Sequence, residues 1–207
     1  MKILIIGNMG YVGPGTVKQL RETYPDSELI GFDIGYFANH LTHTHILPEV
    51  RLNRQIIGDV RQFPAGILEG VDAIVYLAAI SNDPMGAVYQ EVTMDVNFRS
   101  AVRIAGLARA AGVKSFVYAS SCSIYGAADD YPKTESDTLA PLTAYAKSKV
   151  AAEIGLAKLA SKGFIVTCLR FATACGMSDR LRLDLVLNDF VAGAIISKEI
   201  NILSDGT

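Results

Sequence analysis

The stretch Met1-Lys-Ile-Leu-Ile-Ile-Gly7-Asn-Met-Gly10-Tyr-Val-Gly13-Pro14 decides the fold. Its apolar run predicts a buried strand, and Pro14 fits the first turn of a helix. The glycines between them let the backbone turn tightly and approach a pyrophosphate, whose charge rests on helix N-terminal amides. The candidate cofactor-binding residues of this turn are Gly7, Gly10, Tyr11, Val12 and Gly13. The spacing departs by one residue from Gly-x-Gly-x-x-Gly, so a purely structural turn stays the alternative interpretation.

Apolar runs alternate with helical patterns along the next 160 or so residues. We expect strands at 2–6, 28–32, 55–57, 73–77, 115–119 and 165–170, and helices near 12–23, 94–111 and 143–161. Continuous apolar strands are typical of a parallel sheet that is buried on both faces. The expected fold class is therefore α/β: a doubly wound, Rossmann-like parallel sheet with helices on both faces. We expect residues 1–176 to form this domain, and residues 177–207 to begin a smaller C-terminal substrate lobe that is incomplete.

Composition narrows the classes of function. The chain has 207 residues, of which 50% are hydrophobic, and a net charge of −2 with scattered Lys and Arg. This balance favours a globular protein with small-molecule partners over one that binds nucleic acid or membranes, and we expect it in the cytoplasm. The three cysteines lack a CxxC spacing, and the three histidines fall in 39–54 without an interleaved acidic residue. We therefore expect no metal site, and a loop beside the adenosine pocket at 39–54.

Asp33 ends the second expected strand, where a carboxylate can accept hydrogen bonds from a ribose diol. A 2′-phosphate at that position would meet like-charge repulsion, so the sequence favours NAD over NADP. Ile34 follows it and is a further candidate contact. Asp59, with Val60, follows the third strand and is either an adenine contact or a turn former.

Tyr145 and Lys149 lie four residues apart, and this spacing places both on one helix face. An unperturbed phenol has a pKa near about 10, and a neighbouring ammonium favours its ionised form. Thr143 is a plausible N-cap, which puts Tyr145 in the first helical turn. This arrangement predicts an acid/base pair.

The ordered set of motifs resembles the extended short-chain dehydrogenase/reductase superfamily, in particular its NAD-dependent epimerase/dehydratase family. The matching motifs are the glycine triad, Asp33, Gly58-Asp59-Val60, Leu77-Ala78-Ala79, Asn97, Ser120-Ser121-Cys-Ser-Ile-Tyr125-Gly126, Tyr145-x-x-x-Lys149 and Leu169-Arg170-Phe171. The resemblance implies that Tyr145 is the general acid/base, that Lys149 tunes it and binds the nicotinamide ribose, and that Ser121 holds the same substrate oxygen. It also implies NAD contacts by residues beside these, namely Leu77, Ala78, Ala79, Asn97, Ala119 and Phe171.

The sequence departs from the family's dehydratases directly after Ser121. Those enzymes carry Asp-Glu there, whereas this chain has Cys122 and Ser123, so dehydration is disfavoured. Substrate contacts are expected from polar residues near the strand ends, although simple loop or helix-surface roles remain alternatives. These residues are Ser81, Asn82, Ser121, Ser123, Tyr145, Thr173 and Asn188.

Three functions fit these residues. The first is a nucleotide-sugar epimerase that uses NAD to oxidise a sugar hydroxyl transiently and then returns the hydride. The second is a net keto-sugar reductase or dehydrogenase, and the third is a non-catalytic NAD sensor. The expected partners are a nucleotide-diphosphate sugar and a second copy of the chain, paired through the helices near 94–111 and 143–161. If the chain ends at Thr207, we expect NAD binding without efficient turnover.

Overall fold

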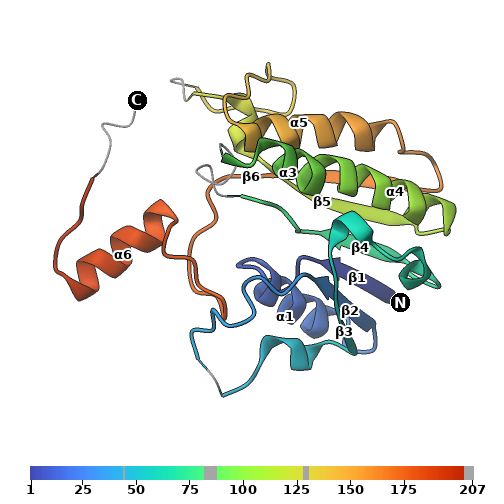
Figure 1. Cartoon of the computed structure of the whole chain (residues 1–207), viewed down its shortest axis with the longest axis horizontal. Helices are drawn as coiled ribbons and strands as arrows, with labels where there is room; N and C mark the ends of the chain where they lie inside the picture. Colours follow the sequence, from blue (N-terminus) through green and yellow to red (C-terminus); the bar gives the residue numbers. More distant parts are fainter. Residues whose placement is uncertain (44, 82–87, 128–130, 203–207) are drawn as a thin grey trace.

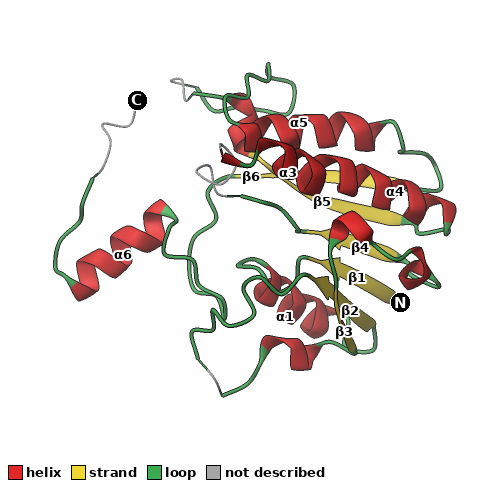
Figure 2. Ribbon diagram, in the orientation of Figure 1, coloured by secondary structure: helices red, strands yellow, loops and turns green. Residues whose placement is uncertain are grey.

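The computed structural model describes residues 1–43, 45–81, 88–127 and 131–202. Six parallel strands form one sheet in the order β3-β2-β1-β4-β5-β6 (Figures 1 and 2). This order reverses between β1 and β4, as in the Rossmann-like fold that the sequence predicts. The strands are β1 (Lys2–Ile6), β2 (Glu28–Asp33), β3 (Arg54–Ile57), β4 (Ala73–Tyr76), β5 (Ser115–Ser121) and β6 (Ile165–Phe171).

Helices cover both faces of the sheet. The helices are α1 (Gly13–Thr23), α3 (Gln90–Met94), α4 (Ser100–Ala110), α5 (Ala144–Ala157) and α6 (Val186–Ile196), with short 3₁₀ turns η1 (Pro48–Arg51), η2 (Val60–Gln62), η3 (Ala65–Leu68) and η5 (Cys122–Tyr125). α1 lies on one side of the sheet, and α3, α4 and α5 lie together on the other (Figure 1). Alternate residues of β1 serve the two faces: Ile3 and Ile5 pack with Leu20 of α1, whereas Leu4 and Ile6 join the larger core. The predicted doubly wound fold is confirmed.

The helix predicted near 94–111 begins earlier and is not uniform. A π-helical segment, η4 (Asp95–Arg99), joins α3 to α4. A π turn widens the helix locally, and such turns are frequent at functional sites. Here it carries Asn97, which is fully buried. The helix expected near 94–111 is therefore present, with an α-helical start four residues earlier and a π-helical segment that the sequence did not indicate.

β5 and β6 run further than predicted. The ladder continues to Ser120↔Arg170 and Ser121↔Phe171, so two serines extend the apolar run of β5. Apolar periodicity does not detect such a polar extension, which here carries Ser121 to the sheet edge.

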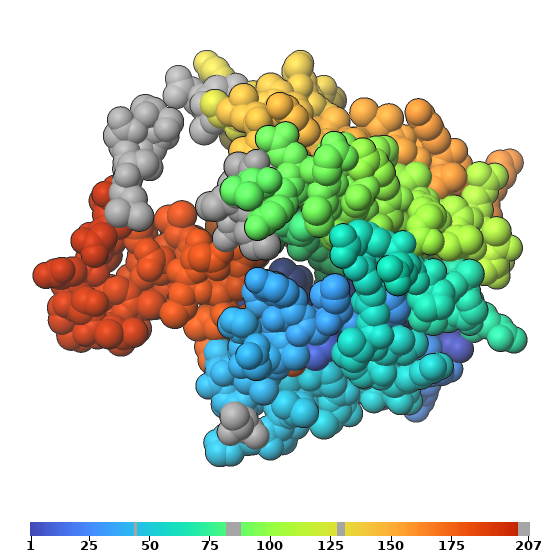
Figure 3. Space-filling model, viewed as in Figure 1, coloured from blue at the N-terminus to red at the C-terminus, as the bar shows by residue number. Residues whose placement is uncertain are grey.

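Large apolar side chains are exposed on β6 and α6, among other parts of the surface. On β6, Ile165, Leu169 and Phe171 are 60%, 41% and 42% exposed. α6 stands apart from the sheet and its helices and projects from the surface (Figures 1 and 3). Within the described ranges, no helix is long and apolar enough to cross a membrane.

Candidate active site

A cavity of about 410 Å³ lies at the carboxyl edge of the sheet. It brings together the glycine-rich turn, the Ser121 segment and the Tyr145–Lys149 helix, as the sequence predicts. Its lining residues are Gly7, Gly10, Tyr11, Val12, Phe37, Leu77, Ala79, Ser81, Ala119, Ser120, Ser121, Cys122, Ser123, Tyr145, Lys149, Phe171, Ala172, Thr173, Ala174, Arg182 and Leu185. Parallel α/β sheets bind ligands at this edge, so the cavity is the candidate active site.

The glycine-rich turn needs glycine at two positions. Gly7 has a φ of +88°, and a Cβ there would lie 2.4 Å from the Ala78 nitrogen. A Cβ at Gly13 would lie 2.0 Å from the Asn8 carbonyl oxygen. The turn is therefore folded tightly into the start of α1, with Pro14 in the first helical turn. This geometry fits a pyrophosphate lying against the helix N-terminus.

Asp33 lies at the carboxyl end of β2, beside this turn. Its carboxylate accepts hydrogen bonds from the Met9 amide at 2.9 Å and the Gly35 amide at 2.8 Å. Burial raises the pKa of Asp33, while these two bonds and the nearby Arg180 act in the opposite direction. The Arg180 guanidinium is itself paired with the Glu49 carboxylate at 2.7 Å. Ile34, next along the chain, is 57% exposed.

Asp59 has a structural role in this fold. It caps η2, and its carboxylate binds the Arg61 guanidinium at 2.6 Å, which lowers the pKa of Asp59. Val60 is buried, and its carbonyl accepts a bond from Arg103. The turn-forming alternative is thus observed, and the adenine contact stays a prediction.

Lys149 is the most unusual titratable group of the cavity. It is 2% exposed, and its Nζ donates to the Ala119 carbonyl at 2.7 Å. Nζ also lies 4.7 Å from the Tyr118 ring centroid and 5.3 Å from that of Tyr145. Burial lowers the pKa of Lys149 to about 7, against the opposing influence of Cys168 and Glu153. Its charge therefore titrates near neutrality, which the sequence did not indicate.

Tyr145 lies in the first turn of α5. The Thr143 hydroxyl accepts a hydrogen bond from the Ala146 amide at 3.1 Å, so the predicted N-cap is confirmed. The cap places Tyr145 at the positive end of the helix dipole, beside the Lys149 ammonium.

Ser121 ends β5 and caps η5. Its Oγ accepts a bond from the Ser123 hydroxyl at 2.9 Å and from the Ser123 amide at 3.2 Å. These two bonds leave the Ser121 hydroxyl proton directed elsewhere, because its oxygen serves only as acceptor in them. Ser121 lines the same cavity as Tyr145.

Asn97 supports the site from behind. Its side chain exchanges hydrogen bonds with the Ile80 backbone at 2.8 and 3.0 Å and donates to Ser148 at 3.0 Å. Ser148 in turn donates to the Tyr145 carbonyl. Because Asn97 is fully buried, the structure places it as a link between the segment after β4 and α5.

A second supporting network was missed by the sequence reasoning. Glu153 accepts a bond from the Ser120 hydroxyl and three from the Arg170 guanidinium, the shortest of the three at 2.7 Å. Arg170 also donates to the Tyr125 hydroxyl at 2.7 Å. One ion pair therefore connects α5, β5, β6 and η5. The sequence signal that could have revealed this network is the position of Glu153 four residues after Lys149. This is the same spacing as from Tyr145 to Lys149, so all three residues share one face of α5.

The candidate substrate residues are distributed unevenly. Ser81 and Thr173 line the cavity, and Ser81 accepts a bond from Arg182 at 2.7 Å. Asn188 is 8% exposed rather than solvent-facing, and its amide binds Gly176, Tyr11 and Arg182. Asn82 lies outside the described residues. The sequence analysis did not identify Arg182, an arginine in the segment after β6 that also lines the cavity.

The histidine segment forms an irregular connection, as expected. His43 binds the Asp179 carboxylate at 3.0 Å, and its ring stacks on that of His45. Within the part of the chain that the structure describes, His, Cys, Asp and Glu form no cluster suited to a metal ion.

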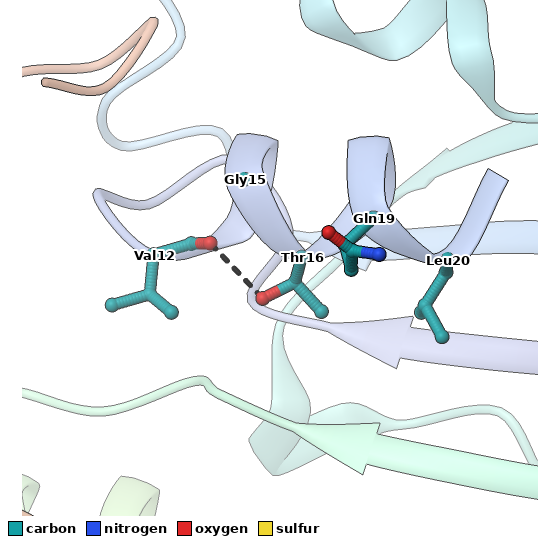
Figure 4. A pocket seen from close by; sticks show the side chains of 5 residues that line it. All are labelled: Val12, Gly15, Thr16, Gln19 and Leu20. Carbon is teal, nitrogen blue, oxygen red and sulfur yellow. Dashed lines mark hydrogen bonds between the residues drawn. The ribbon is translucent and has the colours of Figure 1, made fainter. Parts of the chain in front are cut away.

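A hollow of about 440 Å³ lies along α1 (Figure 4). Its lining is mostly apolar, with the Thr16 hydroxyl donating to the Val12 carbonyl at 3.1 Å. Gly15, Gln19 and Leu20 complete it, and none of its residues carries a titratable group. We assign no chemistry to it.

A family model described as the NAD dependent epimerase/dehydratase family matches residues 3–207. The chain belongs to this family. Among curated relatives, the uncharacterized UDP-glucose epimerase YtcB of Bacillus subtilis is 29% identical over 218 residues, which cover 100% of this chain and 66% of that protein. A dTDP-D-glucose 4,6-dehydratase of Mus musculus is 26% identical over 156 residues, covering 73% and 44%.

Solved structures of other proteins show the same fold. MoeE5 in complex with UDP-glucose and NAD has a TM-score of 0.83 and 26% identity, and the match covers 100% of this chain and 65% of that one. DesIV, a dTDP-glucose 4,6-dehydratase of Streptomyces venezuelae with NAD bound, has a TM-score of 0.79 and 27% identity, covering 95% and 63%. The chain thus spans no more than about two thirds of these relatives. The predicted family is confirmed, and NAD is the cofactor of this family.

Proposed function

We propose that this protein is an NAD-dependent nucleotide-sugar epimerase in which Tyr145 is the general acid/base. One observation carries the proposal: Ser121, Tyr145 and Lys149 line the same cavity as the glycine-rich turn. A dinucleotide with its pyrophosphate at this turn would place its nicotinamide toward Tyr145. The curated relatives named as epimerases and the MoeE5 complex with UDP-glucose and NAD support the substrate class.

The residues divide the chemistry between them. NAD supplies the hydride acceptor and later the hydride donor. Tyr145 removes the proton from a sugar hydroxyl as the hydride leaves, and Ser121 donates to the same oxygen. Lys149 stabilises the phenolate of Tyr145 through its charge. Return of the hydride to the opposite face of the keto sugar gives the epimer, with no net redox change.

Dehydration is a less suitable reaction for this site. A dehydratase needs an acid and a base to remove water, and the two positions after Ser121 are Cys122 and Ser123. Cys122 donates to the Arg170 carbonyl at 3.2 Å, and Ser123 is bonded to Ser121. Neither side chain is a carboxylate, although some relatives are dehydratases.

A net reductase is the second candidate, since it would use the same three residues. The two reactions differ in whether NAD stays bound between turnovers. A non-catalytic NAD sensor is the third candidate, and the retention of Ser121, Tyr145 and Lys149 around one cavity argues against it.

The test is to incubate the protein with NAD and a panel of UDP-, dTDP- and GDP-hexoses. An epimerase converts one sugar into its isomer without lasting absorbance of reduced nicotinamide, whereas a reductase changes that absorbance in proportion to product. Tyr145→Phe should abolish conversion and retain NAD binding, and Tyr24→Phe, which alters an exposed tyrosine, is the control. Conversion at the normal rate by Tyr145→Phe would contradict the acid/base role.

Two further parts of the proposal concern organisation. We place the boundary of the NAD-binding domain at residue 176, with a substrate lobe beginning at 177. We also propose a homodimer formed through α4 and α5, because Ile154 on α5 is 54% exposed. Light scattering on the purified protein tests the dimer, and a monomeric mass would contradict it.

A further inference from the structure

Residues 176–182 run back from β6 to the glycine-rich turn, and we call them the strap. At one end, the Tyr11 hydroxyl donates to the Gly176 carbonyl at 2.8 Å, and Ser178 donates to the Tyr11 carbonyl at 2.6 Å. Asn188 closes the same end, because it binds the Gly176 amide at 2.9 Å and the Tyr11 hydroxyl at 3.1 Å. The strap is therefore bonded to the turn that is expected to hold the pyrophosphate.

Arg180 anchors the strap at a second point, four residues after Gly176. Its side chain is 2% exposed, and its guanidinium binds the Glu49 carboxylate at 2.7 and 3.2 Å. The same guanidinium donates to the Phe37 carbonyl at 3.1 Å and the Ala38 carbonyl at 3.4 Å. These bonds hold the strap against residues 37–38 and Glu49. Breaking them would leave the buried Arg180 charge without a partner, which costs free energy.

The strap thus joins three parts of the cofactor side of the cavity. Tyr11 and Phe37 line the cavity, and Arg182, at the strap's end, forms part of its wall. The positive charge of Arg180 also acts to lower the pKa of Asp33. The pyrophosphate and ribose regions are therefore connected by one segment from the C-terminal part of the chain.

We propose that the strap retains the dinucleotide in its site, with Arg180 as a positioning residue that acts through residues 37–38. The cofactor would then leave only when the bonds of Arg180 and Tyr11 open together. This inference rests on the proposed function, because it takes NAD to lie at the glycine-rich turn. It also favours the epimerase, since a reaction without net redox change has no need to exchange its cofactor.

The experiment measures the release of labelled NAD from the loaded protein after a chase with excess unlabelled NAD. Tyr11→Phe removes two hydrogen bonds and keeps the ring, and Glu49→Gln weakens the ion pair without changing the side-chain size. We expect each to speed release by on the order of tenfold, and Arg180→Ala by more. Arg99→Gln is the matched control, because Arg99 has two carboxylate partners but lies half-exposed on η4.

Two companion measurements separate retention from general stability. Added NAD at saturation should restore turnover in Glu49→Gln to the wild-type level, because Glu49 lies outside the cavity lining and Ser121, Tyr145 and Lys149 are unchanged. The melting temperature of each variant, measured without NAD, should stay close to that of the wild-type protein, although its NAD release is faster.

The outcomes separate the two proposals. Release at the normal rate from both Tyr11→Phe and Glu49→Gln would overturn the strap and leave the proposed function standing. A wild-type protein that binds no NAD would overturn both the strap proposal and the proposed function.

Discussion

The Lys149 ammonium donates a 2.7 Å hydrogen bond to the Ala119 carbonyl, joining α5 to β5 inside the cavity. This bond places the Lys149 nitrogen 5.3 Å from the centroid of the Tyr145 ring. Burial at the same time lowers the pKa of Lys149 to about 7. The Lys149 ammonium is therefore half-titrated near neutral pH without a bound ligand.

The stability of the ligand-free protein should depend on pH through Lys149. Its pKa is about 7 in the folded state and about 10.4 in an unfolded chain, so between these values the unfolded state binds more protons. Stability from this group then rises with pH from about 7 to about 10, and below pH 7 the full cost of the buried charge is present. We expect Lys149→Met to be more stable than the normal protein at pH 6, with a difference that shrinks towards pH 10. Urea unfolding at several pH values measures this, and a difference that does not change with pH would contradict it.

Gly13→Ala should destabilise the turn and abolish NAD binding. The added Cβ would lie 2.0 Å from the Asn8 carbonyl oxygen, so the backbone must shift, at a cost of about 1–3 kcal/mol. Gly15→Ala is the matched control two residues later, because its Cβ meets nothing within 4 Å. It should stabilise α1 by up to about 1 kcal/mol. Chemical unfolding and NAD titration of both variants check this, and equal NAD affinities would count against the pyrophosphate site.

Glu153→Gln should impair the site without touching the cavity. It removes the charge that Arg170 and Ser120 share, and the loss of a mostly buried ion pair should cost about 1–3 kcal/mol. It should also lower the pKa of Lys149 further, because Glu153 acts to raise it. Glu91→Gln is the control, since its side chain is 83% exposed in its pair with Arg99. The pH dependence of unfolding should shift to lower pH in Glu153→Gln alone, and an unshifted profile would argue against this coupling.

Asp33→Ser should relax the choice of dinucleotide. The carboxylate accepts hydrogen bonds from the Met9 and Gly35 amides beside the glycine-rich turn. Its loss should weaken NAD by on the order of tenfold and remove the repulsion towards a 2′-phosphate. Titrations with NAD and NADP measure the ratio of the two affinities. A ratio that stays as in the normal protein would show that Asp33 does not choose the cofactor.

Much of the cavity was predictable because each motif has a local cause. Glycines at a strand-to-helix turn and a tyrosine four residues before a lysine act over a few residues, and their order along the chain placed them at one sheet edge. The supporting contacts were harder to predict. Arg180 meets Glu49 across 131 residues and Arg170 meets Glu153 across 17, and a charged residue in a sequence does not indicate its partner.

The sequence by itself determined the parallel sheet, the glycine-rich turn, the family, and the set of Ser121, Tyr145 and Lys149. It did so because apolar periodicity and short motifs depend on neighbours along the chain. Only the tertiary structure decided that Lys149 is buried against Ala119, that Asn97 lies in a π turn behind the site, and that residues 176–182 cross to the glycine-rich turn. Burial and long-range ion pairs arise from packing between distant segments, and that packing sets the pKa of Lys149 and the environment of Asp33.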